Sequence, residues 1–380
     1  MAKTSNKKLP FRFYDNREKY LMFVTTCSEK WEVAARISQE LPLLVPKPPA
    51  LRLFDAGMGD GTVLTRVLRA VHQRFPTVPI LAVGKEISLE DVRLTVEKLP
   101  DRFHEHPQMV FVATNMFYSE APQLYPRSPE AQAKINWHVF PLEGHTTHDF
   151  DLQIRKMLQP TLASGWRIKT SPKTGNPVYE RPSVVVMYRK DHEFVLNNIV
   201  PRVGQTEGLY DLVLASQPYQ ARIPAETKVR NVLAPLARAL APNGRMIVVQ
   251  STGDDPGMDI IRAIWPNEAP FVTPRRALIN EMQTVLKSER PKLRFLNHSD
   301  KRALFRYSLH TMPTEVSESI GTSTLMAAWN AAVYVAQIDD ARLLPVLEQG
   351  GYLEATSEAL RKHGGLWFTN EAFVVVRENE

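Results

Sequence analysis

The chain has 380 residues, 43% hydrophobic and 23% charged, a composition typical of a soluble protein with one large core or two small ones. The net charge of +6 arises from 47 basic and 41 acidic residues without long like-charge runs, so anionic partners are permitted but not required. The single cysteine, Cys27, excludes an internal disulfide and a cysteine-based zinc cluster.

The N-terminal region does not have the pattern of a targeting segment. Residues 1–8 are polar and basic, but the apolar run at 20–24 is too short for a signal peptide. No stretch reaches the roughly 18 apolar residues of a membrane span. We therefore expect a cytoplasmic protein without a membrane partner.

The first predicted elements are helical. Residues 14–20 and 27–41 have helical periodicity, and Trp31, Val33 and Ile37 share a face of the second segment. Four prolines at 42–51 indicate an extended connector. We predict a helical N-terminal cap over residues 1–45 and a second domain over residues 46–380.

Residues 51–86 have the pattern of one βαβ unit. An apolar run at 51–54 leads into a glycine-rich turn, a helical run continues to Phe75, and a second apolar run at 79–83 precedes Glu86. Glycines in the turn let the backbone bend sharply and let a ligand approach the main chain.

The chemistry of this unit favours an adenosyl ligand without phosphates. Asp55, at the end of the first strand, could accept a hydrogen bond from an amino or cationic group, and Glu86 could accept from both hydroxyls of a ribose. The turn reads Asp55-Ala-Gly-Met-Gly-Asp60-Gly61-Thr. A carboxylate at Asp60 would repel a pyrophosphate at the helix N-terminus, where dinucleotide sites hold one.

At these residues the chain resembles the class I S-adenosylmethionine-dependent methyltransferases, whose first motif has the form D-x-G-x-G-x-G and whose second strand ends in an acidic residue. The matching positions are Asp55, Gly57, Gly59, Gly61 and Glu86. The resemblance implies S-adenosyl-L-methionine as the cofactor, with Asp60 within its binding turn.

The following elements alternate between strand and helix. Strands are predicted at 109–115, 135–141, 210–216, 245–250 and 368–377, and helices at 89–103, 226–240, 256–264, 274–287, 324–338 and 341–361. The helix at 226–240 is expected to end at Pro242-Asn-Gly244 with the glycine in the left-handed conformation. We treat residues 145–205 as an insertion with a β-hairpin that joins 166–169 to 184–188 around a Lys-Thr-Gly-Asn turn.

The alternation predicts an α/β fold with a doubly wound, mostly parallel sheet. With the resemblance, this implies the seven-stranded Rossmann-like methyltransferase fold, with the helical cap and the inserted hairpin added.

The methyl acceptor is expected at Ser216-Gln-Pro-Tyr219, where a predicted strand ends at the edge at which open α/β sheets bind ligands. The segment resembles the [DNS]-P-P-[YFW] motif of amino-directed methyltransferases, with Gln217 in place of the first proline. We predict that Ser216, Gln217 and Tyr219 hold the nucleophile, and that Ser216 also contacts the cofactor.

A second resemblance, to histamine N-methyltransferase and its relatives, covers most of residues 51–376. Its motifs are Trp137-His138, the hydroxyl pair that begins at Thr146, Asp149-Phe150, and Gln217 with Tyr219. It implies a cofactor-binding role for Thr146.

Histidines 138, 145 and 148 cluster near Asp149, but three or four converging metal ligands are not evident, so no metal is predicted. These histidines could instead bind or deprotonate the acceptor. Trp329 and Tyr334 on a late helix fit core packing or a lid over the acceptor.

We predict a methyltransferase that acts on a nitrogen of a small molecule. The alternative is an enzyme that acts on a nucleic-acid base amine or a protein side chain. The basic pI supports this alternative, but no clustered Lys/Arg stripe or RNA module indicates a nucleic-acid partner. A non-catalytic scaffold is a third possibility, against which the intact motif argues. The acceptor and the oligomeric state are not apparent from the sequence.

Overall fold

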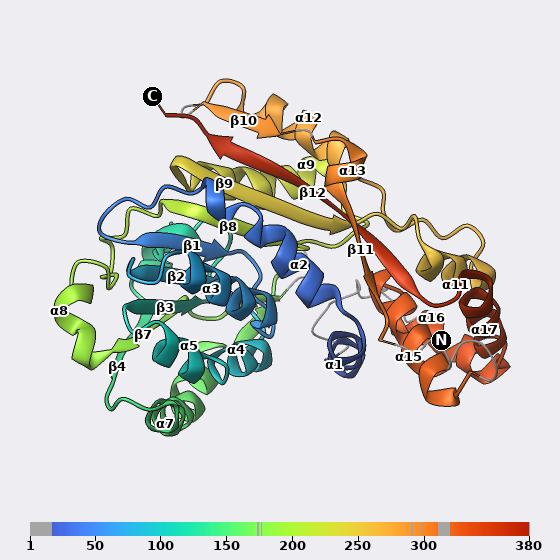
Figure 1. Ribbon diagram of the computed structural model, residues 1–380, viewed down its shortest axis with the longest axis horizontal. Helices are drawn as coiled ribbons and strands as arrows, with labels where there is room; N and C mark the ends of the chain where they lie inside the picture. The colour runs from blue at the N-terminus through green and yellow to red at the C-terminus, as the bar shows by residue number, and fades with distance from the viewer. Residues whose placement is uncertain are drawn as a thin grey trace, which may run out of the picture.

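The computed structural model describes residues 17–172, 175, 177–289, 292–296, 298–310 and 320–379. Its centre is a doubly wound α/β sheet with helices on both faces (Figure 1). The predicted fold class is therefore confirmed, but the strand count is wrong. Within the described residues the main sheet has ten strands, whereas seven were predicted. It contains both parallel and antiparallel strands.

Parallel strands form the centre of this sheet, in the order β3-β2-β1-β8-β9. They are β1 (Leu51–Asp55), β2 (Ile80–Lys85), β3 (Met109–Thr114), β8 (Tyr210–Ser216) and β9 (Leu240–Ser251). Their side chains are almost all buried, because both faces of the sheet are covered. The chain builds outward from β1 in one direction through β2 and β3, and then in the other through β8 and β9, so the strand order reverses between β1 and β8.

Antiparallel strands complete one side. The long strand β12 (Trp367–Arg377) pairs with β9, and its other edge pairs with β10 (Leu293–Leu296) and then with β11 (Leu304–Ser308). The short helix α13 (Asp300–Ala303) lies between β10 and β11. The two strands β10 and β11 thus pair with different parts of the same edge of β12.

On the other side, one strand from the predicted insertion and one strand that precedes it extend the main sheet. Strand β7 (Ser183–Arg189) runs antiparallel to β3, and β4 (Asn136–Leu142) lies beyond it. The separate hairpin pairs β5 (Ile168–Thr170) with β6 (Pro177–Tyr179). The prediction that residues 184–188 form this hairpin is therefore wrong. That run is fully buried in the main sheet, and part of the expected turn lies outside the described residues.

Two hydrophobic cores lie on the two faces of the sheet. The first core contains side chains from α2 (Glu29–Ser38), α3 (Thr62–Arg74), α4 (Leu89–Val96), α5 (Leu99–Glu105) and α7 (Thr147–Gly165). The second contains side chains from α8 (Glu193–Leu196), the π-helix η4 (Val229–Leu233), α10 (Ala234–Arg238) and α12 (Arg275–Leu286). In β1, Leu53 belongs to the first core and Phe54 to the second, as the two-residue period of a strand requires.

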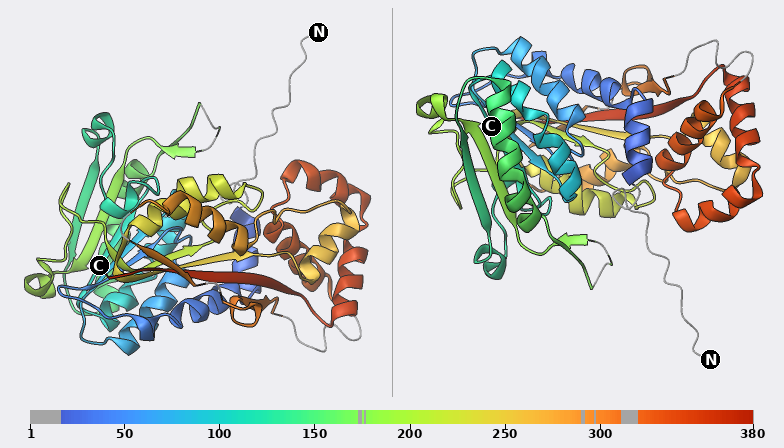
Figure 2. Two further views of the ribbon diagram at one scale, coloured as in Figure 1. Left: turned by 90° about the horizontal axis from the view of Figure 1, so that it is seen from above. Right: turned by 90° about the horizontal axis from the view of Figure 1, so that it is seen from below.

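A third core belongs to a helical lobe at one end of the molecule (Figures 1 and 2). It contains α1 (Arg17–Thr26), α11 (Pro256–Ile264), α15 (Thr322–Val335), α16 (Asp340–Gln349) and α17 (Tyr352–His363). Of the two predicted N-terminal helices, α1 packs on α15, whereas α2 packs on α3 of the sheet. The division of the chain at residue 45 stays a prediction.

Several helix boundaries differ from the predictions. The segments 89–103 and 341–361 are each two helices, the second broken at Gly350, which has a φ of +82°. The helix expected over 226–240 starts as α9 (Ala225–Lys228), continues through η4 and ends at Arg238. After it Asn243, not Gly244, takes the left-handed conformation; a Cβ on Gly244 would lie 2.6 Å from the Tyr210 carbonyl oxygen.

The remaining short helices are η1 (Leu41–Leu43), η2 (Ala121–Gln123), α6 (Pro129–Gln132) and η3 (Lys190–His192). In the part of the chain that the structure describes, no helix combines the length and the apolar character needed to cross a membrane.

Candidate active site

A cleft of about 1350 Å³ opens at the carboxyl ends of the parallel strands, on both sides of the reversal in strand order. This is the position at which open α/β sheets bind ligands. Most of the residues predicted for the site line it, namely Gly57, Gly59, Glu86, Ser216, Gln217 and Tyr219. The predicted residues Asp55, Asp60, Gly61 and Thr146 are not part of its lining.

The glycine-rich turn presents bare backbone to the cleft. A Cβ on Gly57 would meet no protein atom within 4 Å, so the space beside this Cα is open to a ligand. Gly61 has a φ of +75° and precedes α3; a Cβ there would lie 2.7 Å from the Thr95 hydroxyl oxygen. Gly57 thus keeps ligand space open, whereas Gly61 allows the turn to form.

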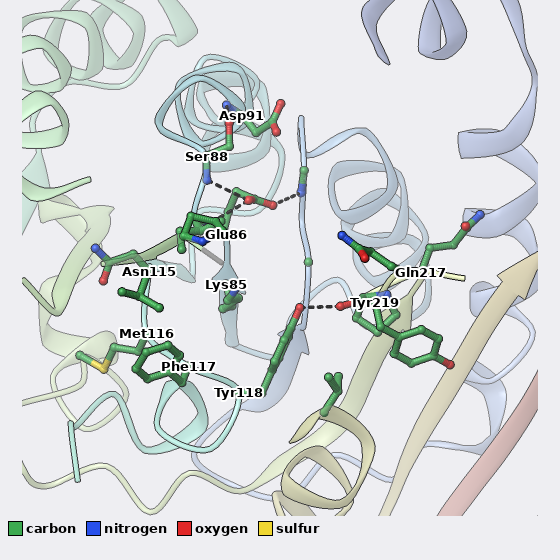
Figure 3. Close-up of a pocket in the computed structure, with 18 of the residues that line it drawn as sticks. Lys85, Glu86, Ser88, Asp91, Asn115, Met116, Phe117, Tyr118, Gln217 and Tyr219 are labelled. Carbon is green, nitrogen blue, oxygen red and sulfur yellow. Dashed lines mark hydrogen bonds between the residues drawn. The ribbon is translucent and has the colours of Figure 1, made fainter. Parts of the chain in front are cut away.

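The carboxylate of Glu86 joins the two loops that follow β1 and β2. Its Oε2 accepts a hydrogen bond from the Gly59 N–H at 3.1 Å, and its Oε1 accepts from the Ile87 and Ser88 N–H groups at 2.7 and 3.0 Å (Figure 3). Each carboxylate oxygen has two lone pairs, so Oε2 can accept one more hydrogen bond. Glu86 therefore shapes the turn and retains an acceptor at the cleft.

Asp55 lies directly behind the turn and is only 2% exposed. Burial raises the pKa of this carboxyl to about 7, although the hydrogen bond from the Gly57 N–H and the charge of Lys30 act in the opposite direction. Because burial disfavours its ionised form, a cationic group of a ligand nearby would favour ionisation.

Asp60 was expected to repel a phosphate group in the cleft, but its carboxylate does not face the cleft. Asp60 is buried, and its carboxylate accepts hydrogen bonds from the Tyr20 hydroxyl and the Lys98 ammonium at 3.0 and 2.7 Å, and a short one from Thr62. Burial alone would raise its pKa, but Lys30 and Lys98 lower it below the usual value. Since Lys98 compensates its charge, Asp60 fixes α1 and the start of α3 rather than facing a ligand.

At the other end of the cleft, Gln217 has an unusual backbone conformation. Its φ is +47°, which is rare for a residue other than glycine, and its side-chain Nε2 donates to Glu29 Oε1 at 2.9 Å. Glu29 is 4% exposed; its Oε2 forms an ion pair with Lys30 at 3.1 Å but accepts no hydrogen bond from the described residues. Such strained residues concentrate at functional sites.

The ring of Tyr219 lines the cleft, but its hydroxyl is directed away from it (Figure 3). The hydroxyl donates to Gln250 Oε1 at 3.2 Å, and Gln250 Nε2 donates to Glu371 and to the Thr273 carbonyl. Burial raises the pKa of Tyr219 far above its usual value. The hydroxyl therefore belongs to a buried network, which leaves only the ring to contact an acceptor.

Several side chains of the cleft were missed from the sequence. Tyr118 crosses the cleft and donates to the Pro218 carbonyl at 2.8 Å, and the Lys85 ammonium lies 4.6 Å from the centre of its ring (Figure 3). Trp166 donates from its indole to the Glu86 carbonyl at 2.8 Å. Lys85 directly precedes Glu86, which was predicted to bind the ribose. This position next to a predicted site residue could have indicated Lys85 from the sequence.

Thr146 lies at the opposite end of α7 from the cleft. Its hydroxyl accepts from the Asp149 N–H and caps the 19-residue helix, whose far end at Trp166 borders the cleft. At 1.5 Å per residue, the helix separates the two ends by about 28 Å. Thr146 is therefore placed for helix capping and not for cofactor contact.

The three predicted histidines also lie outside the cleft lining. His138 contacts Asn136 and stacks on Phe140, and His145 contacts Asp191 at 3.3 Å. Trp329 and Tyr334, both on α15, have different surroundings. Trp329 packs against Trp265 in the helical lobe, whereas Tyr334 lines the cleft.

Comparisons with known proteins show similarity in structure only. No protein-family model matches the sequence, and no curated protein is significantly similar to it. Similar solved structures include the plantazolicin methyltransferase BpumL with S-adenosylhomocysteine, at 10% identity, 96% coverage of this chain and 88% of that chain, and a TM-score of 0.34. The phosphoethanolamine N-methyltransferase 2 of Haemonchus contortus with S-adenosyl-L-methionine has 9% identity, 92% and 53% coverage, and a TM-score of 0.30.

A third similar structure is the [4+2]-cyclase SpnF, with 11% identity, 90% coverage of this chain and 80% of that chain, and a TM-score of 0.36. These likenesses are too weak to assign a function, and SpnF carries the name of a different reaction. The functional argument therefore rests on the residues of the cleft.

Proposed function

We propose that the protein is an S-adenosylmethionine-dependent methyltransferase that methylates a nitrogen of a small molecule. The observation that carries this proposal is the arrangement around Glu86. Its carboxylate holds the glycine-rich turn at the switch point of the sheet, and the same cleft continues to Ser216 and Gln217.

The cleft residues fit an adenosylated sulfonium in shape and charge. The free lone pair of Glu86 Oε2 can accept from a ribose hydroxyl, and the open space beside Gly57 lets a ligand approach the main chain. Glu86 supplies negative charge at the cleft, and ionisation of the buried Asp55 behind the turn would be favoured by a cationic ligand. S-adenosylmethionine would provide an electrophilic methyl group, so the chain has to bind, orient and exclude water.

On the acceptor side, Gln217 is the residue placed to hold a nucleophile. Its Oε1 atom accepts no hydrogen bond from the described residues, so it can accept from an amine N–H, while the buried Glu29 holds the Nε2 atom of the same side chain. The rings of Tyr118 and Tyr334 border the same space. Orientation of the attacking atom is the main catalytic task of such a site.

The finer resemblance to the histamine N-methyltransferase group remains a hypothesis. Gln217 and Tyr219 line the cleft, whereas Trp137, His138 and Thr146 do not. No contact in the described structure favours a macromolecular acceptor over a small one. The proposal of a nitrogen target in a small molecule is based on the position of Gln217 in the cleft.

Calorimetric titration with S-adenosylhomocysteine tests the cofactor. We expect saturable binding of S-adenosylhomocysteine with one site per chain. Tighter binding of NAD than of S-adenosylhomocysteine would refute the proposal. With binding established, mass spectrometry of metabolite extracts incubated with deuteriomethyl-labelled cofactor would identify the methylated acceptor.

A further inference from the structure

The cleft is larger than one ligand requires. Pockets for small ligands usually have volumes of about 300 to 1000 Å³, whereas this cleft has about 1350 Å³. A cofactor on the glycine-rich turn would therefore leave space for a second molecule, and the side chains around that space indicate its chemistry.

Charge is distributed unevenly around the cleft. The helix α2 and the segment after β2 contribute most of its carboxylates, at Glu29, Glu86, Glu90 and Asp91, with Lys30 as the one cation among them. The other elements contribute mainly cations, at Lys85, Arg127, Arg167, Lys228, Arg230 and Arg238, and among the described residues Glu180 is their carboxylate. The Lys228 ammonium donates to the Ala221 carbonyl and to the Thr273 hydroxyl. In Figure 3 the labelled Glu86, Ser88 and Asp91 lie on one side of the cleft, and Met116, Phe117 and Tyr118 on the other.

Not all of these cations carry uncompensated charge. Arg230 and Arg238 form ion pairs with Glu226 and Glu289. Lys85 forms no ion pair with a carboxylate of the described residues, and its ammonium lies over the face of Tyr118. Burial lowers its pKa, although the charge of the neighbouring Glu86 acts in the opposite direction.

The unpaired charges adjoin apolar surface. Arg127, on the segment that follows Phe117 and Tyr118, forms no side-chain ion pair within the described structure. Across from this segment, the π-helix η4 contributes Val232 to the lining. A ligand with an apolar body and an anionic end would complement both features. The half-buried Lys85 would gain most from a charged partner, whereas Arg127 is exposed.

We propose that the methyl acceptor carries an anionic group, a carboxylate or a phosphate, which binds to Lys85 and Arg127. This inference rests on the proposed methyltransferase function and specifies its substrate class. An amine without an anionic group would leave the Lys85 charge uncompensated.

The test uses 8-anilino-1-naphthalenesulfonate as an aromatic anion and N-phenyl-1-naphthylamine as the same ring system without the charge. Each is titrated by fluorescence into the full chain saturated with S-adenosylhomocysteine. We expect Lys85→Met and Arg127→Ala each to weaken binding of the anion about tenfold, as loss of a charged hydrogen bond does, and to leave the neutral probe unchanged. The matched control is Arg276→Ala, since Arg276 is exposed on α12 outside the cleft and its removal should affect neither probe.

Competition identifies the anionic group. Displacement of the fluorescent anion by benzoate supports a carboxylate, displacement by phenyl phosphate supports a phosphate, and displacement by neither refutes the proposal. Wild-type affinity for the anion in both cleft variants also refutes it, provided that calorimetry shows normal binding of S-adenosylhomocysteine. If S-adenosylhomocysteine does not bind the wild-type chain, the methyltransferase function itself fails, a result distinct from loss of the anion site.

Discussion

The two ends of the cleft are built in different ways. The end with the glycine-rich turn comes from one continuous segment, Leu51 to Glu86, and its key contact joins Gly59 N–H to a carboxylate 27 residues further on. The other end depends on contacts between distant segments. Gln217 bonds to Glu29 across 188 residues, and Tyr118 bonds to the Pro218 carbonyl across 100 residues.

This difference indicates which properties each end controls. The turn presents main-chain groups in a geometry that its own glycines allow, so its ligand is fixed by local sequence. The far end presents side chains from α2, β8 and the segment after β3, so small changes in packing can alter its ligand. We therefore expect substitutions at the first end to affect cofactor affinity, and substitutions at the second to affect acceptor use or stability.

The largest effect is expected from Glu86→Ala. The substitution removes the predicted ribose contact and the three hydrogen bonds that hold the turn. With each charged hydrogen bond contributing about 1.5 to 3 kcal/mol, affinity for S-adenosylhomocysteine should fall at least about a hundredfold by calorimetry. Glu97→Ala, at an exposed ion pair of α4, is the matched control and should retain wild-type affinity. Equal affinities in both variants would contradict the assignment of this end.

The sequence predicted this first end well because its pattern is local. The boundaries of β1, α3 and β2 follow from apolar runs and glycines, and the strand at 210–216 was predicted with the observed bounds. Prediction was poorer where an apolar run had two possible partners. Residues 184–188 suit a hairpin or a buried strand equally, and only the main sheet offers them complete burial.

At the second end, Gln217 was predicted from the sequence, but Glu29 and Tyr118 were not. Periodicity indicates that Glu29 starts a helix, but not that this helix places its carboxylate against β8. Asp60 and Thr146 were recognised from motifs, but both lie outside the cleft lining and bond at a helix N-terminus, because hydroxyl and carboxylate groups there also serve as helix caps.

The second prediction concerns pH and Asp55. Its raised pKa means that the folded state retains a proton which the unfolded chain has lost between about pH 4 and 7, so this residue makes stability fall as pH rises through that window. One proton gives a slope of up to about 1.4 kcal/mol per pH unit. Asp55→Asn should remove this contribution, so that urea unfolding shows the variant gaining stability relative to wild type from pH 4 to 7. Parallel stability curves for the two proteins would contradict the buried position of this carboxyl.

The third prediction separates the ring of Tyr219 from its hydroxyl. Tyr219→Phe leaves the buried Gln250 Oε1 without its donor, which should lower the free energy of unfolding by about 1 to 3 kcal/mol. Turnover with the identified acceptor should stay near wild type, because the hydroxyl does not face the cleft. The control Tyr352→Phe, whose hydroxyl donates a weak hydrogen bond to the Met326 sulfur, should change stability little. A large loss of turnover with unchanged stability would show that the hydroxyl contacts the acceptor.

The smallest expected effect tests the strained backbone at Gln217. A left-handed conformation costs a residue with a Cβ roughly 1 to 2 kcal/mol, and glycine avoids this cost. Gln217→Gly should therefore be more stable to urea than Gln217→Ala by about 1 kcal/mol, although both lose the hydrogen bond to Glu29. The neighbouring Ser216, which ends strand β8 without a positive φ, provides the control: there glycine should be the less stable of the two substitutions. If the alanine variant is more stable than the glycine variant at both positions, the backbone at Gln217 is not strained. Its conformation would then not contribute to the structure of the acceptor end.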